Sequence, residues 1–276
     1  MVDWGSEPPL RVGRIDFANC SPIFRALERI GDAGVEYVGG VPTELNRRLR
    51  EGTVDLSPSS SVEFLERPDL YGFLPDLSIS AIGPVMSVAL FSRRPLEALD
   101  GCTVALTGAS ATSVVLTRVL LEGYRKVRPR YGRADAPAEA ALWIGDRALK
   151  EVRAGGWPFV YDLGALWFQE TATPFVFALW ICRREAYRRR PEAVRALYRR
   201  LIRARQLAYR SYPEFAREAP EARWMGAEGL LEYWRTISYD LTAWHLEGLR
   251  RFAEDARALG LLPRVPPLRP LPVESP

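Results

Sequence analysis

The stretch from residue 83 to residue 113 limits the possible folds more than any other part of the sequence. Its two apolar runs, 85–91 and 103–107, have the length of buried strands, and the second leads through the polar loop 108–113 into a helix with apolar side chains. A buried strand that passes through a short loop into a helix is typical of an α/β sheet. The first turn of such a helix leaves backbone N–H groups free, and these groups suit an anion.

The serine and threonine residues of this loop allow two interpretations. They could line an anion site, or Ser110 or Thr112 could merely cap the following helix, because both residue types accept hydrogen bonds from the first N–H groups of a helix. The stretch by itself supports both interpretations about equally, so other parts of the sequence are needed to choose between them.

The first eighty residues alternate between expected strands and expected helices. The expected strands cover residues 10–17, 35–38 and 54–56. A helical pattern follows each of them, with apolar side chains three or four residues apart. This alternation predicts an α/β lobe with a largely parallel sheet.

Two similar segments suggest how the chain divides into lobes. Pro84 and Pro174 each precede an apolar run that ends in a pair of arginines, at 93–94 and at 183–184. We interpret the two runs as paired crossover strands between two lobes, with two unrelated core strands as the alternative. The crossover interpretation assigns residues 93–174 to a second lobe, and residues 1–92 together with 175–276 to the first.

The C-terminal part is expected to be helical and to end in a tail. The helix expected over 188–210 has an apolar stripe of Val194, Leu197, Leu201, Ala204 and Ala208, with arginines away from it. This basic helix could contact nucleic acid, but it lacks interleaved aromatic residues and any known motif, so a solvated face is expected. In the later helices, Leu241, Trp244, Leu249, Phe252 and Ala256 are expected to face inward. The proline-rich tail 263–276 is expected to be extended over the surface or disordered.

Composition places the chain among ordinary globular proteins and excludes several classes of function. Its 276 residues are 47% hydrophobic and 26% charged, and the net charge of +4 is too small to imply a polyanionic partner. The three cysteines lack metal-ligand spacing, the N-terminus does not resemble a secretory signal, and no apolar run approaches the ~18 residues that span a bilayer. We therefore expect a cytoplasmic protein without nucleic-acid or membrane partners, and the sequence does not indicate an oligomeric state.

Four loops share one design, in which an expected strand ends in small polar residues before a helix or turn. These loops are 19–21, 57–61, 107–113 and 145–146, two in each expected lobe. In open α/β sheets, ligands collect beyond the carboxyl ends of the strands. A cleft lined by hydroxyl groups and helix N-termini suits a small anion with a carboxylate at each end. The candidate binding residues are Ser60, Ser61, Thr107, Ser110, Thr112, Ser113, Gly145 and Asp146.

Other catalytic schemes find little support in the sequence. His245 is the only histidine and lies on a late amphipathic helix, so a Ser-His-Asp triad or a histidine-bound metal is improbable and a packed or surface histidine is expected. Cys20 lacks a histidine partner that would form a thiolate, so inert packing is expected. There is no phosphate loop of the Walker type and no dinucleotide fingerprint. We expect no metal and no cofactor.

Several motifs resemble those of one enzyme family. They cover residues 13–22, 75–79, 83–87, 106–113, 144–146, 161–167 and 174–180. Together they resemble the chorismate dehydratases of the futalosine route to menaquinone, whereas the serine cluster 59–61 and the stretch 125–137 depart from that pattern. The resemblance implies an α/β, two-lobed type II periplasmic-binding-protein-like fold with two crossover strands and C-terminal helices. It also implies that Asn19 and Ser87 match the asparagine and serine of the family's active site.

The resemblance further implies a hydro-lyase reaction, in which chorismate loses water to give 3-[(1-carboxyvinyl)oxy]benzoate. Asn19 and Ser87 are neutral hydrogen-bonding groups, so we expect them to orient the substrate and polarise the leaving hydroxyl or a carboxylate. The ring proton would be removed by the substrate's own side-chain carboxylate or, as the competing hypothesis, by Asp146. Two other functions stay open: a non-catalytic binding protein for a small carboxylate, and the related naphthoate synthase, whose histidine-containing motif we do not see.

Overall fold

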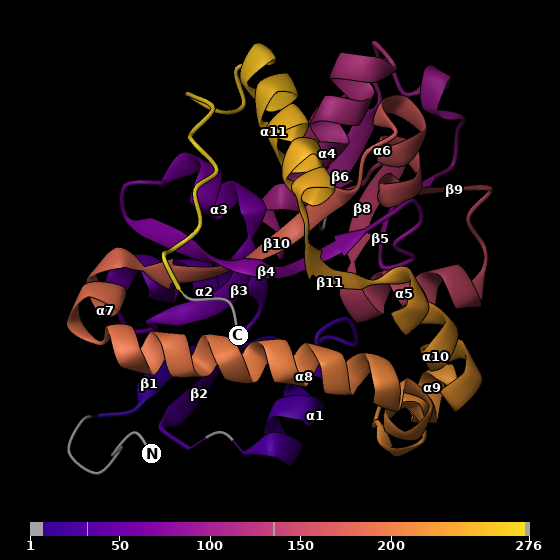
Figure 1. The fold of residues 1–276 in the computed structure, drawn as a ribbon. Coiled ribbons are helices and arrows are strands. Elements are labelled where there is room, and N and C mark those ends of the chain that lie inside the picture. The colour runs from indigo at the N-terminus through magenta and orange to yellow at the C-terminus, as the bar shows by residue number, and fades with distance from the viewer. Residues whose placement is uncertain (1–7, 32, 135, 274–276) are drawn as a thin grey trace.

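The computed structural model describes residues 8–31, 33–134 and 136–273, and it contains two β-sheets with helices packed around them (Figure 1). The strand order is β11-β4-β10-β3-β1-β2 in the first sheet and β7-β6-β8-β5-β9 in the second. The first sheet consists of β1 (Leu10–Arg14), β2 (Val35–Gly39), β3 (Leu56–Ser60), β4 (Tyr71–Ala81), β10 (Phe175–Arg183) and β11 (Ser238–Leu241). The second consists of β5 (Val88–Ser92), β6 (Thr103–Leu106), β7 (Arg130–Arg133), β8 (Ala140–Ile144) and β9 (Phe159–Asp162).

Helices connect these strands and form much of the C-terminal part. In chain order they are α1 (Ser21–Ile30), α2 (Pro42–Glu51), α3 (Ser61–Glu66), η1 (Leu96–Ala98), α4 (Ala111–Arg118), η2 (Val119–Tyr124), α5 (Gly145–Ala154), α6 (Leu163–Thr171), α7 (Arg184–Arg189), α8 (Pro191–Glu218), α9 (Ala222–Met225), α10 (Ala227–Thr236) and α11 (Ala243–Ala258). Local sequence explains several boundaries. For example, α2 begins at a proline and ends at Gly52, whose φ of 75° suits the left-handed C-cap conformation.

The chain passes between the two sheets twice, once before β5 and once before β10. This is the pair of crossings that the sequence predicts. Because β5 already belongs to the second sheet, the expected lobe boundary at residue 93 falls after the first strand of that sheet.

The first sheet is mixed, whereas the sequence predicted a largely parallel one. β1 pairs in parallel with β2 and β3, but β10 is antiparallel to both of its neighbours, β3 and β4. The reason is that β10 enters the first sheet as the chain returns from the second sheet, at the edge where β1 and β3 end. The return places the first residues of β10 beside the carboxyl end of β3.

Two local expectations were wrong. The serine-rich segment expected as a loop after residue 56 is the strand β3 followed directly by α3. The expected C-terminal helices are interrupted by β11, which contains Leu241, and Trp244 is 44% exposed instead of facing inward. Leu249, Phe252 and Ala256 are buried on α11, as expected.

Helix α8 packs against α1 and runs along the side of the first sheet (Figure 1). The five residues of its predicted apolar stripe are all buried, which confirms that prediction. Most buried apolar side chains from both sheets form one continuous cluster, so the two halves of the molecule are closely packed.

The proline-rich tail packs on the first sheet as far as residue 273. The backbone N–H of Leu271 donates to the carbonyl of Phe73 on β4, and both Leu271 and Val273 are buried. A Cβ atom at Gly72 would lie 2.4 Å from Cδ2 of Leu271, so glycine is needed for this close approach. The described part of the tail is therefore extended and ordered, and residues 274–276 lie outside the described range.

One sequence expectation falls partly outside the described residues. The predicted absence of a secretory signal concerns residues 1–9, of which the structure describes only Pro8 and Pro9. Within the described ranges, no helix is long and apolar enough to cross a bilayer.

Candidate active site

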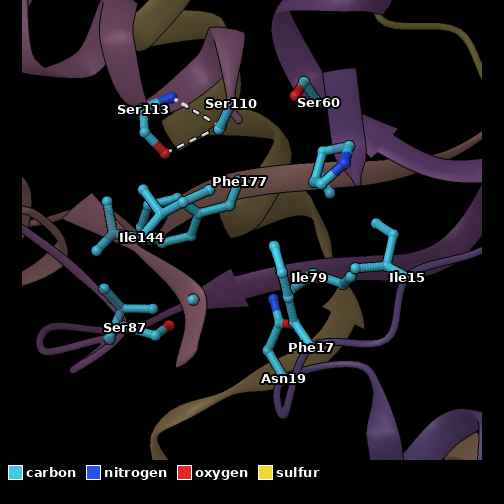
Figure 2. A pocket seen from close by; sticks show the side chains of 15 residues that line it. Ile15, Phe17, Asn19, Ser60, Ile79, Ser87, Ser110, Ser113, Ile144 and Phe177 are labelled. Atoms are coloured by element: carbon cyan, nitrogen blue, oxygen red, sulfur yellow. Dashed lines mark hydrogen bonds between the residues drawn. The ribbon is translucent and has the colours of Figure 1, made fainter. Parts of the chain in front are cut away.

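A pocket lies between the two sheets, at the carboxyl ends of β1, β3, β6 and β8, and encloses about 550 Å³ of empty space that includes its opening to solvent (Figure 2). The lining residues are Ile15, Phe17, Asn19, Pro42, Ser60, Ile79, Val85, Ser87, Val88, Ser110, Ser113, Ile144, Gly145, Phe177 and Ala178.

Six of the ten sequence-predicted site residues line this pocket: Asn19, Ser60, Ser87, Ser110, Ser113 and Gly145. In Figure 2, the hydroxyl groups of Ser60, Ser110 and Ser113 lie on one side of the pocket. Asn19 and Ser87 lie on the other side in the same view. The structure therefore brings together polar residues from three of the four predicted loops, Gly145 from the fourth, and Ser87 just before β5.

Two of the predicted residues, Ser61 and Thr107, use their hydroxyl groups for local structure and do not line the pocket. The Ser61 hydroxyl donates to the carbonyl of Val176 at 2.5 Å, which ties the start of α3 to β10. The Thr107 hydroxyl accepts from the N–H of Ala109 at 3.2 Å, within its own loop. Both hydroxyls are thus engaged with backbone groups.

Thr112 and Asp146 connect the two halves of the molecule beside the pocket. Oγ1 of Thr112, on α4, accepts from the N–H of Val62 on α3 at 3.1 Å. Oδ1 of Asp146, on α5, accepts from the N–H of Ala18 in the loop after β1 at 3.0 Å. Burial raises the pKa of Asp146, and the Ala18 N–H and Lys150 oppose that increase. Both side chains therefore hold segments of the first-sheet half against the second-sheet half.

Asn19 lies in a loop that is fixed from two sides, because the C-terminal part also contacts it. Nε1 of Trp234 donates to the carbonyl of Ala18, and the hydroxyl of Tyr239 donates to the carbonyl of Asn19, each at 2.7 Å. Oδ1 of Asn19 is buried and has no hydrogen-bond partner within the described residues. A buried amide oxygen that the protein leaves unpaired is a group that a bound ligand can satisfy.

Ser87 is placed by the antiparallel pairing of β5 with β8. The register sets Val88 opposite Ile144, so Ser87 lies beside Gly145, whose N–H donates to the Ser87 carbonyl at 2.7 Å. Gly145 has a φ of 61°, and a Cβ there would lie 3.1 Å from Cδ2 of Phe17. Glycine at this position lets the start of α5 approach the loop that contains Phe17.

The serines at the start of α4 combine the two roles that the sequence left open. Oγ of Ser110 accepts from the N–H of Ser113 at 3.2 Å, so Ser110 is the N-cap of α4. Its hydroxyl also pairs with that of Ser113 at 3.0 Å, and both residues line the pocket (Figure 2). Ser60 precedes α3 without capping it through its side chain.

The remaining lining residues form an apolar wall that sequence reasoning missed. Phe17, Ile79, Ile144 and Phe177 belong to it. None of the lining residues is charged, so an anion in this pocket would depend on hydroxyl groups and on N–H groups at the start of α4. Ile79 and Phe177 lie in apolar strand runs, and nothing in those runs marks the residues that face the pocket.

The structure agrees with the expectation that His245 and Cys20 are packed residues without a catalytic role. His245 is 3% exposed, and its Nδ1 pairs with the hydroxyl of Thr242 in a capping box at the start of α11. Burial lowers the pKa of His245 and raises that of Cys20, and neither residue lines the pocket. Among the described residues there is no group of three or more His, Cys, Asp or Glu side chains that could hold a metal.

Comparisons with known proteins agree with this architecture. Residues 10–258 match a protein family described as menaquinone biosynthesis. A chorismate dehydratase from Thermus thermophilus is 38% identical over 92% of this chain and 96% of its own length. A 1,4-dihydroxy-6-naphtoate synthase from the same organism is 32% identical, over 51% of this chain and 53% of its own.

A solved structure confirms the predicted fold. The periplasmic aliphatic sulphonate binding protein SsuA from Escherichia coli superposes with a TM-score of 0.66, over 95% of this chain and 96% of its own. Because the two sequences are only 14% identical, this similarity concerns the fold alone.

Proposed function

The chain belongs to the menaquinone biosynthesis family, and we propose that it is a chorismate dehydratase, a hydro-lyase that converts chorismate to 3-[(1-carboxyvinyl)oxy]benzoate and water. The observation that carries the proposal is the meeting of Asn19 and Ser87 in one uncharged pocket, with the Asn19 amide oxygen left unpaired. The extent of similarity favours this reaction over the synthase, which the chain matches over only about half its length.

The pocket suits a ring that carries two carboxylates. Its apolar wall can cover the faces of the ring, and its serines lie on one side of the cavity. Ser60, Ser110 and Ser113, with the free N–H groups at the start of α4, would bind one carboxylate. The NH2 group of Asn19 or the hydroxyl of Ser87 would bind the other.

The reaction needs a group that accepts the ring proton, and the lining residues include no ionisable side chain. Asp146 does not line the pocket, and its carboxylate already accepts a backbone hydrogen bond. We therefore assign the proton to the substrate's own side-chain carboxylate, held in place by Asn19 and Ser87. The ring C–H bond breaks, its proton passes to that carboxylate, and its electron pair forms the new ring double bond as the C–O bond breaks. The leaving hydroxyl takes the proton back from the carboxylic acid and departs as water, which leaves the ring aromatic and the carboxylate regenerated.

The direct test mixes the purified protein with chorismate and follows the ultraviolet spectrum of the aromatic product. Mass spectrometry should show a product that is lighter than chorismate by one water. Chorismate that stays unchanged in the presence of folded protein would overturn the proposal. The cytoplasmic location expected from the sequence stays a prediction.

A further inference from the structure

The backbone just before Ser87 adopts a strained turn. The N–H of Ser87 donates to the carbonyl of Val85 at 2.7 Å, and Met86 between them has a φ of 61°. A hydrogen bond across one residue with a positive φ describes a classic γ-turn, which is rare and strained. A non-glycine residue holds this conformation only where the surroundings favour it.

The carboxylate of Asp162 supplies those surroundings. Its Oδ2 accepts from the N–H of Met86 at 2.6 Å and from that of Val85 at 3.0 Å. Its Oδ1 accepts from the N–H of Ala165 at 2.9 Å and so caps α6. One carboxylate therefore joins the first turn of α6 to the turn that precedes Ser87.

The approach of α6 to this turn is unusually close. A Cβ atom at Gly164 would lie 2.6 Å from the carbonyl oxygen of Gly83, so no other residue fits at position 164 without a shift of backbone. A helix cap alone requires a single acceptor oxygen. The second oxygen of Asp162 instead accepts hydrogen bonds from backbone N–H groups of another segment, which includes Val85, 77 residues away in the sequence.

We propose that Asp162 is a positioning residue for Ser87. This inference rests on the proposed function, in which the hydroxyl of Ser87 acts on the substrate. The carboxylate holds the N–H groups of Val85 and Met86, the γ-turn is retained, and Ser87 is kept at the edge of the pocket beside Gly145. Asp162 itself does not line the pocket.

Asp162 is half-buried. Burial raises its pKa, and the N–H groups of Ala165, Val85, Met86 and Gly164 oppose that increase. The ligands of this carboxylate are thus backbone donors, which an asparagine amide could satisfy only in part, because its NH2 group cannot accept a hydrogen bond.

The decisive experiment is a double-mutant cycle on chorismate turnover. Asp162→Asn should lower kcat about 10- to 100-fold with KM nearly unchanged, because a displaced catalytic group is lost from the reaction step more than from binding. In a Ser87→Ala background, the same substitution should lower kcat by less than about twofold. An equal fold-loss in both backgrounds would show that Asp162 acts through general structure and would overturn the inference.

A second pair of variants tests the turn without touching the carboxylate. Met86→Val should lower kcat about tenfold, because a β-branched residue tolerates a positive φ poorly, whereas Met86→Leu should retain activity. Equal activity of the two variants would contradict the inference. This pair decides alone if Asp162→Asn does not fold or if the Ser87→Ala background is too slow to assay.

Thr242→Ala is the matched control, because it removes a helix cap at α11 that has no contact with the turn before Ser87. It should lower the melting temperature without the selective loss of kcat. If the wild-type protein leaves chorismate unchanged, the proposed function fails by itself. The positioning role is then judged from a crystal structure of Asp162→Asn, in which an unmoved turn and an unmoved Ser87 would refute it.

Discussion

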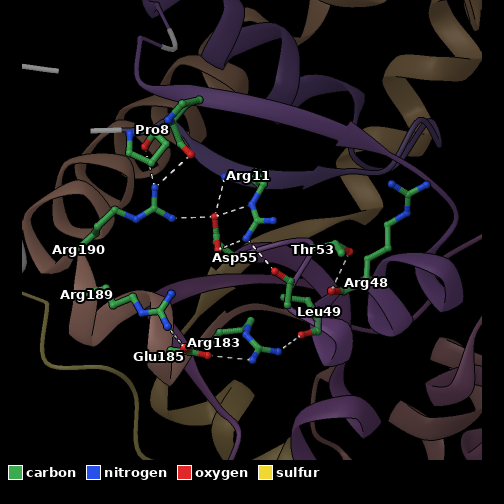
Figure 3. Close-up of polar contacts among 12 residues, drawn as sticks. Pro8, Arg11, Arg48, Leu49, Thr53, Asp55, Arg183, Glu185, Arg189 and Arg190 are labelled. Carbon is green, nitrogen blue, oxygen red and sulfur yellow. Dashed lines mark hydrogen bonds and ion pairs between the residues drawn. The ribbon is translucent and has the colours of Figure 1, made fainter. Parts of the chain in front are cut away.

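Two polar regions lie at opposite ends of the same strands, and they differ in how their polar groups are satisfied. One is the pocket, at the ends of β1 and β3 (Figure 2). The other, which we call the arginine cluster, comprises Arg11, Asp55, Arg183, Glu185, Arg189 and Arg190 at the opposite end of these strands (Figure 3). β10 also connects them, with Phe177 in the pocket and Arg183 in the cluster.

The arginine cluster is charged but internally paired. Oδ1 of Asp55 accepts from Nη2 of Arg11 at 2.9 Å, and Oδ2 accepts from Nη2 of Arg190 at 2.8 Å and from the N–H of Arg11 at 2.9 Å. Nη1 of Arg190 donates to the carbonyls of Pro8 and Pro9. Arg183 donates to the carbonyl of Leu49 at the end of α2. The cluster therefore holds the first sheet, α2 and α7 together.

The comparison teaches that charge and size are poor guides to function in this molecule. The hollow beside the arginine cluster is larger than the pocket, yet the arginines that line it already donate to carboxylates and carbonyls. The pocket carries no charge but leaves a buried oxygen of Asn19 free. An unpaired polar group is the more informative sign of a ligand site.

The largest effect that would test this contrast is expected at Asp55. Its side chain is only 7% exposed, and Asp55→Asn leaves two guanidinium groups without their carboxylate. We expect the free energy of unfolding to fall by about 3–5 kcal/mol, the usual loss when one partner of a buried pair is removed, with chorismate turnover per folded molecule unchanged. Urea unfolding and turnover, measured on the same preparation, check the expected loss of stability and the expected unchanged activity. The control Arg189→Ala, at an exposed position, should alter neither.

The contribution of Asp55 also has a defined pH dependence. Burial favours a higher pKa for its carboxyl, but the hydrogen bonds and charges of Arg11 and Arg190 outweigh this and hold the pKa below the usual range. Its stabilisation is therefore complete above the ordinary pKa of aspartate, about 4, and is lost as the pH falls through the lower folded-state value. The difference in unfolding free energy between wild type and Asp55→Asn should shrink below pH about 4, and a constant difference would contradict this reading.

The opposite pattern is expected in the pocket. Ser87→Ala and Asn19→Ala should each lower kcat about 10²- to 10³-fold, as the loss of one preorganised polar contact does, with unfolding free energies within about 1 kcal/mol of wild type. Steady-state kinetics and urea unfolding of the same variants measure this. If these variants lost much stability but kept their turnover, the pocket would behave like the arginine cluster and the comparison would be wrong.

The smallest effect is expected at Asp146. Asp146→Asn retains an oxygen at Oδ1 that can accept from the N–H of Ala18, so we expect turnover within about twofold of wild type. If Asp146 were the general base, the loss would be about 10²- to 10⁴-fold. Steady-state kinetics of the folded variant therefore sharpens the comparison, because it separates a charged group that positions a loop from one that takes part in the reaction.

Sequence reasoning predicted the α/β fold, the two crossings and three of the four loops, because strand ends and helix starts are local features. The fourth expected loop, 57–61, is the strand β3 running directly into α3. It could not select among neighbouring hydroxyls. Ser60 lines the pocket and Ser61 does not, since α3 begins at Ser61 and the Ser61 hydroxyl donates to the carbonyl of Val176. The role of Asp162 depends on a partner segment far away in the sequence. Sequence reasoning therefore identified the motif 161–167 but assigned no role to Asp162.

β11 was missed because it is short and lies between two helices, and its partner β4 precedes it by more than 150 residues. The apolar wall was missed for a similar reason. Apolar side chains of a strand look alike in sequence, and only the meeting of the two sheets determines which of them, such as Phe177, border the pocket.

The anchoring of the Asn19 loop affects when this protein can become functional during synthesis. The hydrogen bonds to the carbonyls of Ala18 and Asn19 cannot form until their donors, Trp234 and Tyr239, have been synthesised more than two hundred residues later. A nascent or truncated chain that ends before α10 contains every residue that lines the pocket but lacks two supports of one of them. Competence for chemistry is therefore acquired only when nearly the whole polypeptide has been made.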